Sequence, residues 1–181
     1  VLGTHLFDIM RRFAGDPQWV FGRVLTGEQS RDIQRTDVRM EGPEGMGPIA
    51  GDDITAIYNF AAGTSGHFAS RKSSDTSGQR WGIDLVGTRG VLRIRAGHVP
   101  EIWMSSSRPD QDPMWRRLDL PDGIQPTSQE QANHLLLDDL AAAIDNNREP
   151  EAGGRTARWT IEMAHGVYAS QRTGRRMKLP L

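Results

Sequence analysis

Two polar side chains near the start of the sequence could take part in acid–base chemistry. His5 and Asp8 are three positions apart, so on a helix both lie on the same side. An imidazole titrates near neutral pH and can exchange a proton with a hydroxyl group, as the oxidation of a sugar or polyol requires. The pair could equally serve the helix, with His5 capping and packing its first turn and Asp8 complementing the helix dipole. Spacing alone leaves both interpretations open.

The remaining histidines offer no comparable pattern. His67, His98, His134 and His165 have no spacing that joins them to His5 as metal ligands, and the sequence has no cysteine. No G-x-G-x-x-G loop follows an expected strand, and no P-loop occurs. We therefore predict no metal site, and no NAD or NADP site formed by these 181 residues alone.

A helix over residues 3–14 must position His5 and Asp8. Thr4 is placed to cap its first turn, and Gly15-Asp16-Pro17 ends it. Apolar residues recur at helical spacing on one of its faces, at Leu6, Ile9, Met10 and Phe13.

The middle of the sequence has the pattern of β-strands. Strands are predicted at residues 18–27, 53–60, 65–73, 81–86, 91–95, 101–105 and 115–120. Short connections at 61–64 and 87–90 favour antiparallel hairpins, whereas the polar stretch 28–51 is predicted to be a long loop.

The last third changes to helical period. An amphipathic helix is predicted over residues 128–147, capped by Ser128, with an apolar stripe at Leu137, Leu140, Ala141 and Ile144. A second helix is predicted over residues 155–173, and its central Gly166 favours close backbone packing. The predicted fold class is α+β: a single domain over residues 1–181, with an open, mostly antiparallel β-sheet and helices packed on one face.

The other face of such a sheet would need a partner. Five aromatic side chains are more than one small core face requires: Trp19, Phe21, Trp81, Trp103 and Trp115. We therefore expect a homo-oligomer that buries the open sheet face.

The composition excludes several other partners. The sequence has 22 Lys plus Arg against 23 Asp plus Glu, a formal net charge of −1, which leaves no global positive field for nucleic acid. No apolar run approaches the ~20 residues of a membrane span, and no signal pattern opens the sequence. A cytoplasmic protein without a nucleic-acid or membrane partner is expected.

The segment Gly3-Thr4-His5-Leu6-Phe7-Asp8 resembles the Gly-x-His-x-x-Asp segment that opens the second domain of the Gfo/Idh/MocA family of NAD(P)-dependent oxidoreductases. Further similar segments follow in the same order, so that the resemblance covers essentially the whole chain: residues 52–54, 59–63, 66–68, 83–92, 147–150 and 168–180.

The resemblance implies that cofactor binding and substrate binding belong to two different domains. In this family an N-terminal Rossmann domain binds NAD or NADP and carries a catalytic lysine, and the C-terminal domain forms the substrate wall and the oligomer contact, a fold like the C-terminal domain of glyceraldehyde-3-phosphate dehydrogenase. The chain resembles the second domain only, so we expect the fragment alone to be inactive. His5 matches the family histidine that hydrogen-bonds or deprotonates the substrate hydroxyl, and Asp8 is expected to bind substrate beside it.

One position departs from the family pattern. The family's Asp-x-x-x-His motif has an aspartate four residues before the histidine, where this sequence has Val1. The resemblance thus implies the substrate-binding domain of a sugar or polyol oxidoreductase, and this departure favours the alternative of a noncatalytic sugar-binding or assembly module of the same fold.

Overall fold

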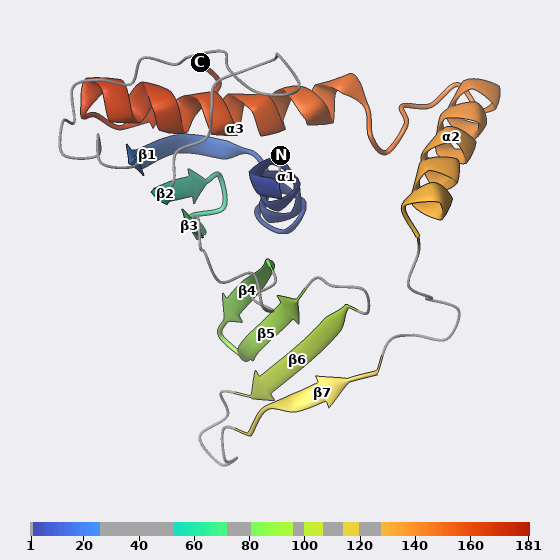
Figure 1. Cartoon of the computed structure of the whole chain (residues 1–181), viewed down its shortest axis with the longest axis horizontal. Coiled ribbons are helices and arrows are strands. Elements are labelled where there is room, and N and C mark those ends of the chain that lie inside the picture. The colour runs from blue at the N-terminus through green and yellow to red at the C-terminus, as the bar shows by residue number, and fades with distance from the viewer. Residues whose placement is uncertain (1, 26–52, 72–80, 96–99, 107–113, 120–127) are drawn as a thin grey trace. The chain divides into compact units, whose positions relative to one another are not determined.

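The structure is a computed structural model of the chain that describes residues 2–25, 53–71, 81–95, 100–106, 114–119 and 128–181. The predicted loop at 28–51 lies outside the described residues. Along the chain the elements are α1 (Leu2–Ala14), β1 (Pro17–Leu25), β2 (Asp53–Phe60), β3 (Ser65–Arg71), β4 (Gly82–Gly87), β5 (Gly90–Arg95), β6 (Glu101–Ser106), β7 (Arg116–Leu118), α2 (Gln129–Asp145), α3 (Gly154–Thr173) and β8 (Met177–Lys178) (Figure 1).

The strands form two antiparallel sheets of four rather than the one sheet expected from the sequence. One sheet has the order β3-β2-β1-β8, and the other has the order β4-β5-β6-β7. Correspondingly, the chain separates into two compact units, the first comprising Val1–Ser74 and Gly153–Leu181 and the second comprising Asp75–Ala152. The α+β class and the antiparallel pairing predicted from the hairpin turns are confirmed, but short-range patterns could not show which hairpins join the same sheet.

The first unit has the predicted arrangement of a sheet with helices on one face. α3 packs along β1, and α1 packs against α3 (Figure 1). The core between them contains Val20 and Tyr58 from the sheet and Met163 from α3, all three completely buried. Phe7 of α1 completes it, because its ring lies 4.6 Å from that of Phe68 and 5.6 Å from that of Tyr58, measured between centroids. Burial of this apolar surface is the main stabilising contribution.

Gly166 explains how closely α3 approaches the sheet. A Cβ atom at this position would lie 2.7 Å from Cγ1 of Val20 and 3.0 Å from Cδ2 of Leu179. The close packing predicted for this glycine is therefore confirmed.

Ser170 of α3 supplies a hydrogen-bond acceptor to the edge of β1 that the short strand β8 does not reach. β8 pairs with Trp19 and Val20 alone, so the rest of that edge of β1 has no neighbouring strand among the described residues. The buried Ser170 hydroxyl accepts a hydrogen bond from the Gly22 N–H (3.0 Å) and donates one to the Arg175 carbonyl (2.6 Å). A helix side chain thus satisfies buried backbone groups that would otherwise destabilise the fold.

In the second unit, a tight turn connects β4 and β5, and surface ion pairs link their side chains. Gly90 begins β5 at φ 151°, and a Cβ atom there would collide with the Ser105 carbonyl, so only glycine fits. Arg93 and Arg95 both pair with Asp84, with shortest N–O distances of 3.1 and 2.7 Å. The Arg93 guanidinium also lies 4.4 Å from the centre of the Trp115 ring.

Helix α2 forms with the predicted cap but without the predicted burial. Ser128 and Gln131 make a reciprocal capping box. Leu137, Leu140 and Ile144, however, are exposed, and among the described residues of its own unit α2 makes no extensive contact with a strand. The amphipathic pattern correctly predicted a helix, whereas the expected packing on the sheet is not observed.

Two further predictions differ from the structure. α1 begins at Leu2, so Thr4 lies inside the helix and is not its cap. The strand β8 was missed because two residues are too short to produce an alternating pattern.

Candidate functional site

The structure places His5 and Asp8 on the same helix, near the N-terminal end of α1. His5 is exposed and Asp8 is half-buried. Residues three apart on a helix have Cβ atoms about 5–6 Å apart, so the two side chains project from neighbouring positions. The hydrophobic face of α1 fixes this orientation, because Phe7 and Met10 are buried in the core and turn the remaining positions outward.

Among the described residues, one of the two carboxylate oxygens of Asp8 has a hydrogen-bond partner. Oδ2 accepts a hydrogen bond from Nε of Arg12, one turn further along α1, at 3.1 Å. Oδ1 is buried and has no donor in this described part of the chain. A buried acceptor without a donor costs free energy, on the order of 1–3 kcal/mol, and such atoms are uncommon in native proteins.

The other histidines do not join His5 in the described part of the chain. His67 lies on β3, His134 on α2 and His165 on α3, each of them exposed. His98 lies outside the described residues. Within the described ranges no three His, Asp or Glu side chains gather in a geometry that could hold a metal ion.

The five aromatic side chains expected on one open sheet face are divided between two sheets. Phe21 (46% exposed) and the half-buried Trp19 lie on the face of the first sheet opposite the core, where Phe21 pairs across the strands with Ile57 (38% exposed). Trp103 lies on β6 of the second unit, and Trp81 and Trp115 immediately precede β4 and β7. The local sequence pattern could not indicate this division.

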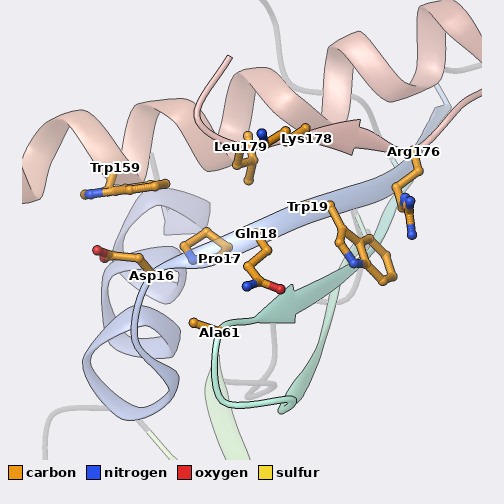
Figure 2. Close-up of a pocket in the computed structure, with 9 residues that line it drawn as sticks. All are labelled: Asp16, Pro17, Gln18, Trp19, Ala61, Trp159, Arg176, Lys178 and Leu179. Carbon is orange, nitrogen blue, oxygen red and sulfur yellow. The ribbon is translucent and has the colours of Figure 1, made fainter.

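A pocket of about 560 Å³ lies within the first unit and was not predicted (Figure 2). It is lined by Asp16, Pro17, Gln18, Trp19, Ala61, Trp159, Arg176, Lys178 and Leu179. These residues come from segments far apart in the sequence, so no local motif could have revealed the pocket. It lies at the C-terminal end of α1, away from His5 at the other end of the helix.

Two carboxylates outside the His5 region, Asp84 and Asp139, have lowered pKa values. Burial tends to raise the pKa of Asp84, but hydrogen bonds from Arg95 and Arg93 and their positive charges outweigh it and hold that pKa below its usual value. A hydrogen bond from Arg148 and another from the Glu151 N–H lower the pKa of Asp139. These carboxylates lie in ion pairs that stabilise turns and strands.

No helix among the described residues is long and apolar enough to cross a membrane. No curated protein sequence matches the chain at a significant level.

The fold is shared with several solved oxidoreductase structures. The chain is 20% identical to an aldose-aldose oxidoreductase from Caulobacter crescentus crystallised with glycerol, with a TM-score of 0.69 over 98% of this chain and 46% of that one. An NAD-binding oxidoreductase from Klebsiella pneumoniae has 15% identity and a TM-score of 0.73 over 99% and 50% of the two chains. Levoglucosan dehydrogenase in complex with NADH and levoglucosan has 14% identity and a TM-score of 0.72 over 99% and 49%.

The chain thus spans about half the length of the solved structures it matches, and at these identities the likeness establishes the fold. The sequence itself matches the family described as oxidoreductase family, C-terminal alpha/beta domain, over residues 1–179. Because this match covers almost every residue, the chain belongs to the Gfo/Idh/MocA oxidoreductase family, as the C-terminal α/β domain.

Proposed function

We propose that the chain is the substrate-binding and oligomerisation domain of an NAD(P)-dependent oxidoreductase that acts on a sugar, a polyol or a related hydroxy compound by hydride transfer. The observation that carries the proposal is the family match over residues 1–179. The glycerol and levoglucosan complexes of two proteins with the same fold support a polyhydroxylated substrate.

The nicotinamide cofactor is proposed to bind to a separate Rossmann domain of the parent protein. The residues of this chain do not fit it, because dinucleotide sites of that type require parallel strands joined by a glycine-rich loop to a helix. Every strand pairing in the two described sheets is antiparallel, and the sequence has no G-x-G-x-x-G loop. The proposed role of this chain in the reaction is therefore substrate binding and proton transfer.

His5 is proposed to bind the substrate hydroxyl and to accept its proton. Its exposure on α1 leaves the ring accessible to a ligand, and imidazole accepts protons near neutral pH. Asp8 lies beside it with a side chain that is 31% exposed, and its Oδ2 can accept a hydrogen bond from a second hydroxyl of the same ligand. Together the two side chains would orient a polyol by adjacent hydroxyl groups.

Replacing His5 in the parent enzyme tests this assignment. His5→Ala should lower kcat by ~10²–10⁴-fold, the usual contribution of a general acid–base group. The melting temperature should change little, because an exposed side chain leaves no cavity. His165→Ala, which removes an exposed histidine from α3, is the matched control and should retain wild-type kcat.

The opposite pattern would overturn the assignment. If His5→Ala lowered the melting temperature while kcat stayed unchanged, His5 would be a structural residue of α1. The alternative of a noncatalytic sugar-binding or assembly module would then be preferred.

The open face of the first sheet is proposed to form the homo-oligomer contact. Phe21 and Ile57 are exposed next to each other on this face, and a stable interface usually buries at least ~1,000 Å². Light scattering should therefore detect a dimer or larger assembly, and Phe21→Asp should dissociate it. A wild-type mass of one chain at high concentration would contradict the proposal.

A further inference from the structure

The pocket at the C-terminal end of α1 combines a buried apolar floor with aromatic walls. Pro17 and Leu179 are buried beneath it. Figure 2 shows Trp159 at one end, near Asp16, and Trp19 at the other end, beside Arg176. Its volume of about 560 Å³ falls in the range of roughly 300–1,000 Å³ typical of small-molecule sites.

The backbone around the pocket is held by long-range hydrogen bonds. The pairing of β1 with β2 shifts register between Pro17 and Trp19, so Gln18 occupies a β-bulge. The Gln18 carbonyl accepts a hydrogen bond from the Leu179 N–H at 2.8 Å, and its side-chain Oε1 accepts one from Asn59 Nδ2 at 3.1 Å. The segments 16–19 and 176–179, which supply most of the pocket lining, are therefore held together before any ligand binds.

The charges in the pocket favour an anion. Asp16 is neutralised by an ion pair with Arg11 at 2.7 Å. Arg176 and Lys178, by contrast, form no ion pair with any acidic side chain of the described residues, and both are exposed. The Arg176 guanidinium rests 5.1 Å from the centre of the Trp19 ring, which holds it at the pocket's edge. Two cations that lack an acidic partner in this part of the chain would attract one carboxylate.

The remaining lining groups favour a hydroxylated ring. The indole of Trp159 is half-buried and presents an apolar surface against which a flat ring can pack. The Gln18 amide and the carboxylate of Asp16 can exchange hydrogen bonds with hydroxyl groups at the same end of the pocket.

We propose that this pocket is a second ligand site, distinct from His5 and Asp8, that binds a small sugar acid. The carboxylate of the ligand binds Lys178, which lies between Trp159 and Arg176 (Figure 2), and its ring packs on Trp159, while Arg176 adds to the positive charge of the pocket. The site is separated from the His5 region by most of α1, since the nine residue steps from His5 to Ala14 span about 14 Å of helix.

Titration of the chain with D-glucuronate, followed by calorimetry and tryptophan fluorescence, tests the proposal. Saturable binding at one site is expected, with much weaker binding of uncharged D-glucose. The double variant Arg176→Gln/Lys178→Gln should raise Kd about tenfold or more, because it removes charge-assisted hydrogen bonds. Trp159→Ala should also raise Kd, with circular dichroism used to verify that the variant is folded.

Matched variants distinguish binding in this pocket from binding elsewhere on the chain. Arg172→Gln removes an exposed cation of α3 outside the pocket and should leave Kd unchanged. His165→Ala removes an exposed histidine of α3 outside the pocket and should also bind D-glucuronate normally.

Three results would overturn the proposal. The first is absence of saturable D-glucuronate binding, and the second is an unchanged Kd in the double variant. The third is equally tight binding of D-glucose or of inorganic phosphate, because the site would then not recognise the acid and the ring together.

Discussion

The two units of the chain differ in how they bury apolar side chains. In the first unit Val20, Tyr58, Phe60 and Met163 are essentially inaccessible to solvent. In the described part of the second unit only Ala143 (2% exposed) and Ser105 (8% exposed) are buried. The first unit therefore contains a core of its own, whereas the second leaves most of its apolar side chains partly or fully exposed.

The cause is the presence or absence of a helix layer. α3 covers the first sheet along β1 and supplies Met163, Gly166 and Val167 to the core. The second sheet has no comparable helix contact among the described residues, and α2 exposes its own leucines. The ion pairs of Asp84 and the stacking of Arg93 on Trp115 lie on the surface of that sheet. Exposed interactions of this kind contribute less to stability than a buried apolar core does.

The largest expected difference is between two leucines, one from each unit. Leu179 is 4% exposed and Leu137 is 62% exposed. Leu179→Ala should lower the free energy of unfolding by about 2–4 kcal/mol, because it leaves a cavity in the core. Leu137→Ala should change it by less than about 0.5 kcal/mol. Urea denaturation of both variants measures the difference, and equal losses would mean that Leu137 is buried in the protein as it exists in solution.

A smaller effect is expected from close packing in the first unit. Gly166→Ala gains about 1 kcal/mol of helix propensity but forces Cβ against the buried Val20, and overpacking usually costs about 1–3 kcal/mol. We expect a net loss of about 1 kcal/mol in thermal denaturation. Gly154→Ala, in the same helix with nothing within 4 Å of the added Cβ, should be neutral or stabilising. A stabilised Gly166→Ala variant would show that α3 can move away from β1.

The smallest effect concerns the dependence of the second unit on pH. Arg95 and Arg93 lower the pKa of Asp84 in the folded chain, against the opposing effect of burial. Its ion pairs therefore contribute stability above the unfolded pKa of about 3.9, and this contribution is lost as pH falls through that value towards the folded pKa.

Comparison of Asp84→Asn with the wild type tests this expectation. Because Asp84 is about one-third exposed, the variant should be less stable at pH 7 by no more than about 1 kcal/mol, and the difference should shrink as pH falls below about 4. Amide hydrogen exchange in β4 and β5 can locate the effect. A difference that persists at low pH would mean that Asp84 acts through packing and not through its charge.

Local patterns in the sequence predicted the elements better than their packing. The caps, turns and periods gave α1, the β2–β3 and β4–β5 hairpins, α2 and α3 to within a few residues, since these features depend on neighbours along the chain. The Ser128 cap is confirmed for the same reason, and the close packing at Gly166 is also confirmed, although its neighbour Val20 lies far away in the sequence. The catalytic and substrate-binding roles of His5 and Asp8 stay predictions, although both residues lie together on α1 as their spacing required.

The sequence by itself determined the α+β class, the antiparallel hairpins and, through ordered motifs along the whole chain, the family. Only the tertiary structure decided that the strands divide into two sheets, that the leucines of α2 remain exposed, and that Trp159 and Arg176 line one pocket with Gln18. The physical reason is the sequence separation over which interactions act. Dihedral preferences, caps and hydrophobic periods act between residues close in sequence, whereas sheet membership, burial and pocket formation depend on contacts between segments farther apart in the chain.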